Sequence, residues 1–148
     1  MVFPSLIPPG FTAVETEQLE SLFVAPFADQ NTRRRLVGGF LDFVDVLRKI
    51  QLRCEIWIDG SFTTSKVRPS DIDILILCGE ADLRQLGEEG FNMLEAVTRR
   101  RDETKARFFC DVYVCDAANE RRVSYWRNWF GYSKDGTPKG IARLRIEQ

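Results

Sequence analysis

Hydrophobic positions along the chain switch between helical and strand-like spacing, and this pattern predicts a domain that mixes both. In residues 32–50 apolar side chains recur every three or four positions, as on a helix that buries one face, with Asp29 or Asn31 available to cap it. Cys54–Asp59 and residues 71–78 are dense in apolar and β-branched side chains, which predicts two strands joined through a Gly60-Ser61 turn.

The rest of the chain continues the alternation of helices and strands. The pattern predicts an extended N-terminal segment over residues 1–12, a weak helix over 13–23, helices over 90–101 and 121–130, a strand over 107–115 and an edge strand over 141–146. We therefore expect an α/β (α+β) fold with a mixed β-sheet of about four or five strands flanked by helices, as one domain over residues 1–148.

Composition narrows the chemistry open to this domain. The 148 residues carry 21 Lys and Arg against 22 Asp and Glu, so any binding of a polyanion must be local rather than driven by overall charge. The sequence has no histidine, which excludes Ser-His and Cys-His nucleophiles and removes the commonest general base and zinc ligand. Catalysis would have to use carboxylates, metal ions or lysine.

The cysteines and the absence of long apolar runs predict a cytoplasmic protein. The four cysteines occupy apolar positions and form no C-x-x-C pair, as expected for small core residues in a reducing compartment. The N-terminus lacks a basic leader and no apolar run approaches 18 residues, so we expect no membrane partner.

Two carboxylates, Asp71 and Asp73, open the second predicted strand and are candidates for metal binding. Strand alternation points both to one face, with α-carbons about 6.5 Å apart. Two carboxylates this close repel each other unless a cation or a proton intervenes. The alternative is that Asp71 caps a turn and Asp73 pairs with an arginine, and for an isolated D-x-D motif this alternative is favoured.

A third carboxylate, Asp111, interrupts the aromatic strand predicted over residues 107–115. Alternation places it on one face with Phe109 and Tyr113, where an isolated charge needs a partner. An ion pair with Arg107 or Arg127 would supply one. Because Asp71 and Asp73 lie on another strand of the same sheet, we favour metal ligation by all three carboxylates.

The turn between the first two strands is a candidate for phosphate binding. Gly60 allows a ligand to approach the backbone closely, and Ser61 is positioned to open a short helix. Lys66 and Arg68 follow in the loop and could neutralise a triphosphate. An ordinary turn and a solvated basic loop are the alternatives.

The stretch GSFTTSKVRPSDIDI resembles the signature of the DNA polymerase β type nucleotidyltransferase superfamily, in which a Gly-Ser turn and a spacer precede an acidic-hydrophobic-acidic motif. The resemblance implies that Gly60 and Ser61 hold the phosphates of a nucleoside triphosphate such as ATP. It also implies that Asp71, Asp73 and Asp111 are catalytic and bind two Mg²⁺ ions, or Mn²⁺. The implied reaction transfers a nucleoside monophosphate to an acceptor and releases pyrophosphate.

The size of the chain resembles minimal nucleotidyltransferases that act as antitoxins beside a helical toxin, although Phe62-Thr63-Thr64 departs from the Ala-Arg-Gly often found there. This similarity implies a toxin-antitoxin or defence system in which the acceptor is a partner protein or an RNA end. Three groups of residues could bind such a partner, and solvation or core packing is their more common role: Arg33-Arg34-Arg35, Arg99-Arg100-Arg101, and the aromatic group Tyr125, Trp126, Trp129, Phe130 and Tyr132.

Two further interpretations stay open from the sequence alone. The chain could be a catalytically quiet binding module of the same fold that neutralises a partner protein. Alternatively, the carboxylates could be ordinary ion pairs in a domain of other function, which would be favoured if Asp111 lay far from Asp71 and Asp73.

Overall fold

The structure, a computed structural model, describes residues 2–147 and is built on one five-stranded mixed sheet. In chain order the elements are β1 (Gly10–Ala13), the 3-10 turn η1 (Thr16–Gln18), α1 (Leu19–Phe23), α2 (Asn31–Lys49), β2 (Cys54–Asp59), the 3-10 turn η2 (Gly60–Thr63), β3 (Ile72–Cys78), α3 (Glu80–Arg84), α4 (Gly87–Thr98), α5 (Arg101–Phe108), β4 (Cys110–Asp116), α6 (Glu120–Phe130) and β5 (Gly140–Ile146). The expected mixed sheet flanked by helices is confirmed.

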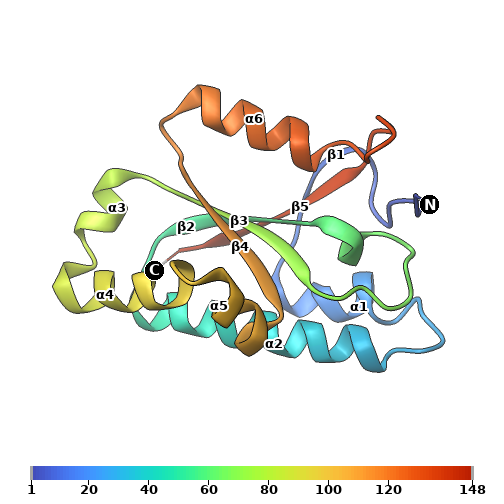
Figure 1. Cartoon of the computed structure of the whole chain (residues 1–148), viewed down its shortest axis with the longest axis horizontal. Helices are drawn as coiled ribbons and strands as arrows, with labels where there is room; N and C mark the ends of the chain where they lie inside the picture. Colours follow the sequence, from blue (N-terminus) through green and yellow to red (C-terminus); the bar gives the residue numbers. More distant parts are fainter. Residues whose placement is uncertain (1, 148) are drawn as a thin grey trace.

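The strands lie in the order β1-β5-β2-β3-β4. The central strands β5, β2 and β3 are antiparallel to their neighbours in that group, while β1 runs parallel to β5 and β4 runs parallel to β3. Helix α6 covers one face of the sheet, and α1, α2, α4 and α5 lie on the other (Figure 1). No helix within residues 2–147 has the length and apolar character needed to cross a bilayer.

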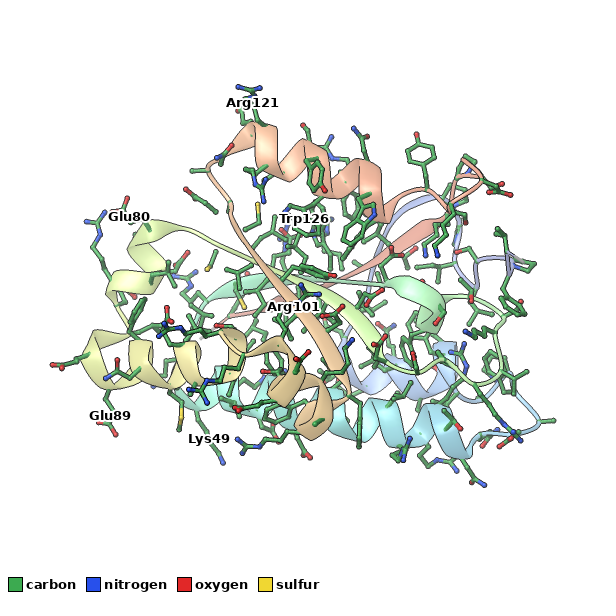
Figure 2. The ribbon with its side chains drawn as sticks, in the orientation of Figure 1. Lys49, Glu80, Glu89, Arg101, Arg121 and Trp126 are labelled. Carbon is green, nitrogen blue, oxygen red and sulfur yellow. The ribbon has the colours of Figure 1, made fainter. Side chains whose placement is uncertain are left out.

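Strand alternation divides the apolar side chains between two cores. On the α2 side, Phe40 and Phe43 pack with sheet residues such as Ile74 in the larger cluster. On the α6 side, Leu75 packs with Trp126 in a smaller cluster, and Figure 2 shows Trp126 between α6 and the sheet. Burial of each large side chain stabilises the fold by about 1.5–3 kcal/mol. Even-numbered β3 residues therefore face α2, and odd-numbered ones, including Asp73, face α6.

The structure corrects the prediction of an edge strand at the C-terminal end. Strand β5 lies inside the sheet, between β2 and the short N-terminal strand β1. An inner strand can carry this basic residue because Arg143 lies on the α6 side of the sheet, where it pairs with Glu55 of β2 at 3.1 Å. Residues 10–12, within the segment expected to be extended, are extended and form part of the sheet. The helix expected from residue 13 begins only at the η1 turn.

The region around Asp111 also differs from its prediction. Arg101–Phe108 forms α5, a helix that the sequence reading assigned partly to a strand, and β4 begins only at Cys110. Phe109 ends the helix in the left-handed conformation at φ 59°, so Phe108 and Phe109 do not continue the alternation of the strand. The α4 helix likewise ends at Thr98 rather than at residue 101.

The cysteines occupy the core positions that their apolar surroundings predict. Cys78, Cys110 and Cys115 are buried, Cys54 is partly buried, and none forms a disulfide. Burial raises the pKa of the Cys78 thiol to about 11, which keeps it protonated at neutral pH.

Arg33 on α2 is fully buried and binds backbone carbonyls in place of a carboxylate. Its Nη1 donates to the carbonyl oxygens of Phe23 and Phe62, and its Nη2 donates to those of Thr64 and Lys66, at 2.6–3.0 Å. Burial lowers the pKa of Arg33 to about 10, so it stays charged at neutral pH. The expectation that Arg33 belongs to a solvated or RNA-binding surface cluster is therefore wrong.

Replacing this guanidinium tests how strongly it holds the loop. Arg33→Met should lower the free energy of unfolding by about 3 kcal/mol, because it leaves buried carbonyls without donors. Arg34→Met is the matched control, since Arg34 lies at the surface, where it pairs with Glu20 and donates to the Gln30 side chain, and it should change stability by about 0–1 kcal/mol. Urea unfolding of both variants measures the difference, and equal effects would contradict the assigned role.

Candidate functional site

Three carboxylates lie in one row across neighbouring strands. Asp59 pairs in register with Asp73 across antiparallel β2 and β3, and Asp73 pairs with Asp111 across parallel β3 and β4. All three have odd residue numbers, like the β2, β3 and β4 residues of the smaller core, and therefore face α6. Asp71 lies two residues before Asp73, at the entrance to β3. The structure thus brings Asp111 beside Asp73, so the observation that would have favoured ordinary ion pairs, a remote Asp111, is not made.

Among these carboxylates, Asp73 has the least positive charge nearby to balance its own charge. Within residues 2–147 its side chain makes no hydrogen bond, and no ion-pair partner lies within 4.0 Å. Partial burial, followed by the negative charges of Asp71 and Asp111, raises the pKa of Asp73 to about 6. This carboxylate therefore titrates close to neutral pH and is open to a cation.

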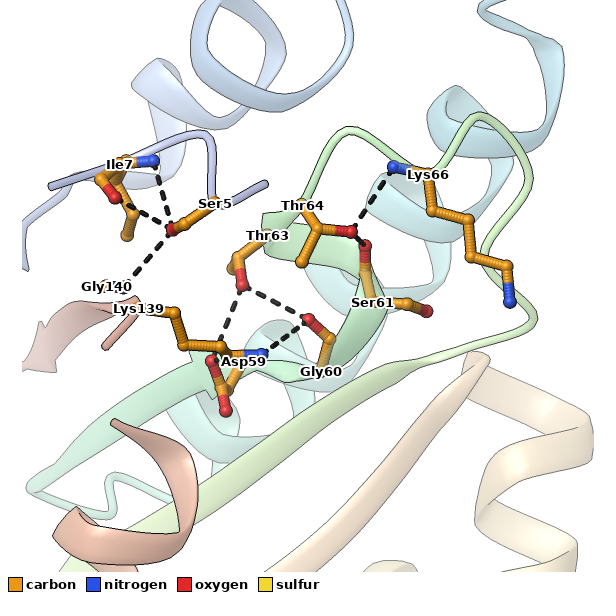
Figure 3. Close-up of polar contacts among 10 residues, drawn as sticks. All are labelled: Ser5, Ile7, Asp59, Gly60, Ser61, Thr63, Thr64, Lys66, Lys139 and Gly140. Carbon is orange, nitrogen blue, oxygen red and sulfur yellow. Dashed lines mark hydrogen bonds and ion pairs between the residues drawn. The ribbon is translucent and has the colours of Figure 1, made fainter. Parts of the chain in front are cut away.

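The Gly60 turn packs directly against Asp73. Gly60 has φ +80°, and a Cβ there would collide with the Asp73 carboxylate, so both the backbone conformation and the space require glycine. The Nζ of Lys139 donates to the Gly60 carbonyl at 3.1 Å and forms an ion pair with Asp59 at 3.2 Å (Figure 3). Burial raises the pKa of Asp59, and the Lys139 ammonium opposes that rise.

The loop that follows the turn is held by the N-terminal segment. The Leu6 N–H donates to the Thr63 carbonyl at 2.8 Å, and the Ser65 N–H donates to the Pro4 carbonyl at 2.9 Å. The Oγ of Ser5 accepts from the Gly140 N–H at 3.2 Å, which ties the same segment to the start of β5 (Figure 3). Together with Arg33, these contacts fix the backbone of the loop from two sides.

Two cations of α5 reach over the edge strand to the opposite end of the row. Arg101 donates from Nε and Nη2 to Oδ1 of Asp111 at 3.0 and 2.7 Å, and it lies over β4 in Figure 2. Lys105 lies 3.4 Å from Asp71 and 4.0 Å from Asp111. Tyr113 donates its hydroxyl to Oδ2 of Asp111 at 3.1 Å. An arginine does pair with Asp111, but it is Arg101 rather than Arg107 or Arg127.

The residues fit magnesium by their chemistry and not by their present positions. Between residues 2 and 147 no group of three or more Cys, Asp or Glu side chains is arranged to hold a metal ion. Carboxylate oxygens are nevertheless the ligands that Mg²⁺ prefers, and Asp73 has no other partner. Because Arg101 and Lys105 occupy Asp111 and Asp71, we expect a divalent cation to displace them.

A cavity of about 390 Å³ opens beside the turn and part of the carboxylate row. Its lining includes the predicted residues Gly60, Ser61, Lys66 and Asp73, together with Asp59 and Lys139. The short helix expected at Ser61 is confirmed as the 3-10 turn Gly60–Thr63. Arg68 does not line the cavity. It is exposed and pairs with Asp29 at 2.9 Å.

Sequence reasoning missed several residues of this site. Asp59 ends a strand that was predicted correctly. Strand alternation places it on the same face as Trp57, and this was a usable signal. Arg101 and Lys105 are spaced i,i+4, which places them on one face of a helix, but this signal required the helix to be recognised. Lys139 sits in a turn and had no signal, because only strand order brings it to Asp59.

The chain matches the Family of unknown function (DUF6932) over residues 2–145 and belongs to that family. No curated protein and no solved structure matches the chain.

The raised pKa of Asp73 predicts a pH-dependent cost to stability. A carboxyl whose pKa rises from 3.8 to about 6 on folding favours the native state below pH 4, and this contribution is lost as pH rises through 6. Asp73→Asn should therefore exceed the wild type in unfolding free energy by about 1–2 kcal/mol at pH 8, and by little at pH 4. Urea titrations at both pH values measure this, with Asp42→Asn on the exposed face of α2 as control. A variant less stable than wild type at pH 8 would contradict it.

Proposed function

We propose that the protein is a magnesium-dependent nucleotidyltransferase, which moves a nucleoside monophosphate from a nucleoside triphosphate to an acceptor. The observation that carries the proposal is the register of the sheet, which sets Asp73 beside Asp111 and against the Gly60 turn. A carboxylate pair next to a tight glycine turn and a polar cavity suits a phosphate chain and its metal ions. The resemblance of residues 60–74 to the superfamily signature agrees with this arrangement.

The carboxylates, the glycine turn and Lys66 have separate roles in the proposed reaction. Asp71, Asp73 and Asp111 would hold the magnesium, which stabilises negative charge on the phosphates when bound. The Gly60-Ser61 turn and Lys66 contact the phosphates from the cavity wall. The acceptor hydroxyl attacks the α-phosphorus, its proton passes to a carboxylate of the row, and pyrophosphate leaves. Arg68 has no part in this scheme, because it is not among the residues that line the cavity.

The two arginine runs give little support to an RNA end as the acceptor. Neither arginine run presents three free cations, since Arg33 is buried and Arg101 binds Asp111. A phosphate backbone needs several exposed cations in a row, so the support for RNA weakens. A cognate partner of the toxin-antitoxin kind is the acceptor that we retain.

One observation favours a second candidate, the catalytically quiet binding module. Arg101 and Lys105 form ion pairs with Asp111 and Asp71, and such pairs can be purely structural. In that case the same fold would mask a partner protein and would bind neither magnesium nor triphosphate.

Removing one carboxylate tests the transferase directly. Asp71→Asn should lower nucleotide transfer to an acceptor, or hydrolysis of the triphosphate, by about 100-fold or more, while the circular dichroism spectrum stays that of the wild type. Release of pyrophosphate with Mg²⁺ and each of the four triphosphates is the measurement. Asp45→Asn on the exposed face of α2 serves as the control, and unchanged activity in Asp71→Asn would refute the proposal.

Competition between Arg101 and the metal distinguishes the two candidates. Arg101→Ala should bind Mn²⁺ about 3-fold more tightly than the wild type, because a cation no longer competes for Asp111. Arg100→Ala is the matched neighbour, since Arg100 pairs only with Glu103 on the helix surface. Calorimetric titration measures the affinities. If Mn²⁺ binds to none of the three proteins, the transferase proposal fails and the carboxylates are structural ion pairs, as the binding module requires.

A further inference from the structure

Part of the wall of the cavity is aromatic. Trp129, at the end of α6, and Tyr132, just after it, both line the cavity, and each keeps 51% of its surface exposed. Phe3 of the N-terminal segment lines the same space. Core packing of α6 explains Trp126 and Phe130, which are buried, but it does not explain the exposure of these two rings.

Neighbouring residues hold the ring of Trp129 and the backbone of Tyr132 in place. Trp129 meets Tyr113 edge to face with ring centroids 5.5 Å apart, and its ring lies 5.1 Å from that of Trp126. Tyr132 lies in a bridge with Pro138, and the Lys139 N–H closes the loop by donating to the Gly131 carbonyl at 2.9 Å. A packed ring such as Trp129, and a Tyr132 whose backbone is held, bind a planar ligand with little loss of conformational entropy.

Uncommitted cations line the same cavity. Lys66 and Lys134 are both lining residues, and within residues 2–147 neither has a carboxylate within 4.0 Å. Lys139 is already engaged by Asp59 and the Gly60 carbonyl. The cavity therefore combines a polar floor, two free ammonium groups and an aromatic wall. Its volume of about 390 Å³ lies in the range of small-molecule sites rather than of protein interfaces.

We propose that Trp129 and Tyr132 stack the base of the nucleoside triphosphate, while Lys66 and Lys134 bind its phosphates. This inference rests on the proposed function and adds the part of the substrate that the carboxylates do not contact. A planar base and a polyanionic chain in one ligand match the aromatic wall and the free cations together. Stacking tolerates every base, so the four triphosphates should bind similarly, with purines tighter because their rings are larger.

A comparison of ATP with inorganic tripolyphosphate, both with Mg²⁺, tests the aromatic wall by calorimetry. The wild type should bind ATP about 5- to 100-fold more tightly than tripolyphosphate, which has the phosphates without the base. Trp129→Ala should bring the affinity for ATP close to that for tripolyphosphate. Tyr125→Ala is the matched control, because Tyr125 is 55% exposed on the same helix and lies outside the cavity lining, and it should bind ATP as the wild type does.

Tyr132→Ala carries the same test if Trp129→Ala fails to fold, since Tyr132 lies in a loop. Fluorescence gives an independent reading, because Trp57 and Trp126 are buried and ATP should quench the exposed Trp129. Equal affinity of the wild type for ATP and tripolyphosphate would overturn the stacking role and leave the phosphate site intact, as would wild-type binding of ATP by the variants. If neither ligand binds to the wild type, the proposed function fails, and the stacking role fails with it.

Discussion

The register of β2, β3 and β4 is the constraint on which the site depends, because it places Asp59, Asp73 and Asp111 in one row facing α6. Three neighbouring carboxylates in a partly buried row repel one another, so the surrounding elements must supply positive charge. Lys139, just before β5, meets Asp59 at one end, and the α5 residues Arg101 and Lys105 meet the other end. Asp73 in the middle receives no ion pair within the described residues, and burial together with the charges of Asp71 and Asp111 raises its pKa.

A second constraint keeps the glycine turn in position against this row. The buried Arg33 binds the carbonyls of Phe62 within the turn and of Thr64 just after it. The N-terminal segment pairs with the residues that follow, and Lys139 holds the Gly60 carbonyl. These contacts come from parts of the chain that are far apart in sequence, namely α2, the first residues and the start of β5. The two ends of the chain thus contribute to the same cavity, which makes an intact fold a condition for the site.

The sequence predicted those parts of the fold and site that depend on local pattern. The β2 strand, the short helix at Ser61 and the β3 strand that carries Asp73 all follow from alternation and turn chemistry, whereas Asp71 lies just before β3 rather than within it. The position of β5 inside the sheet does not, because a four-residue β1 covers its outer edge and carries almost no pattern. The helix α5 was missed because its surface is mostly polar and the aromatic residues after it suggested a longer strand. Missing α5 also hid Arg101 and Lys105 as partners of the carboxylates.

The ion pairs of the row differ in how easily they can be exchanged. Arg101 and Lys105 keep nearly half of their side-chain surface exposed, and exposed pairs contribute only about 0–1 kcal/mol. The pair of Lys139 with Asp59 is buried on both sides, and breaking such a pair costs about 3–5 kcal/mol. In the proposed function, a divalent cation would therefore replace the partners of Asp71 and Asp111 but not the partner of Asp59. On that proposal Asp59 holds the turn in place, and Asp71, Asp73 and Asp111 are the carboxylates that would bind the metal.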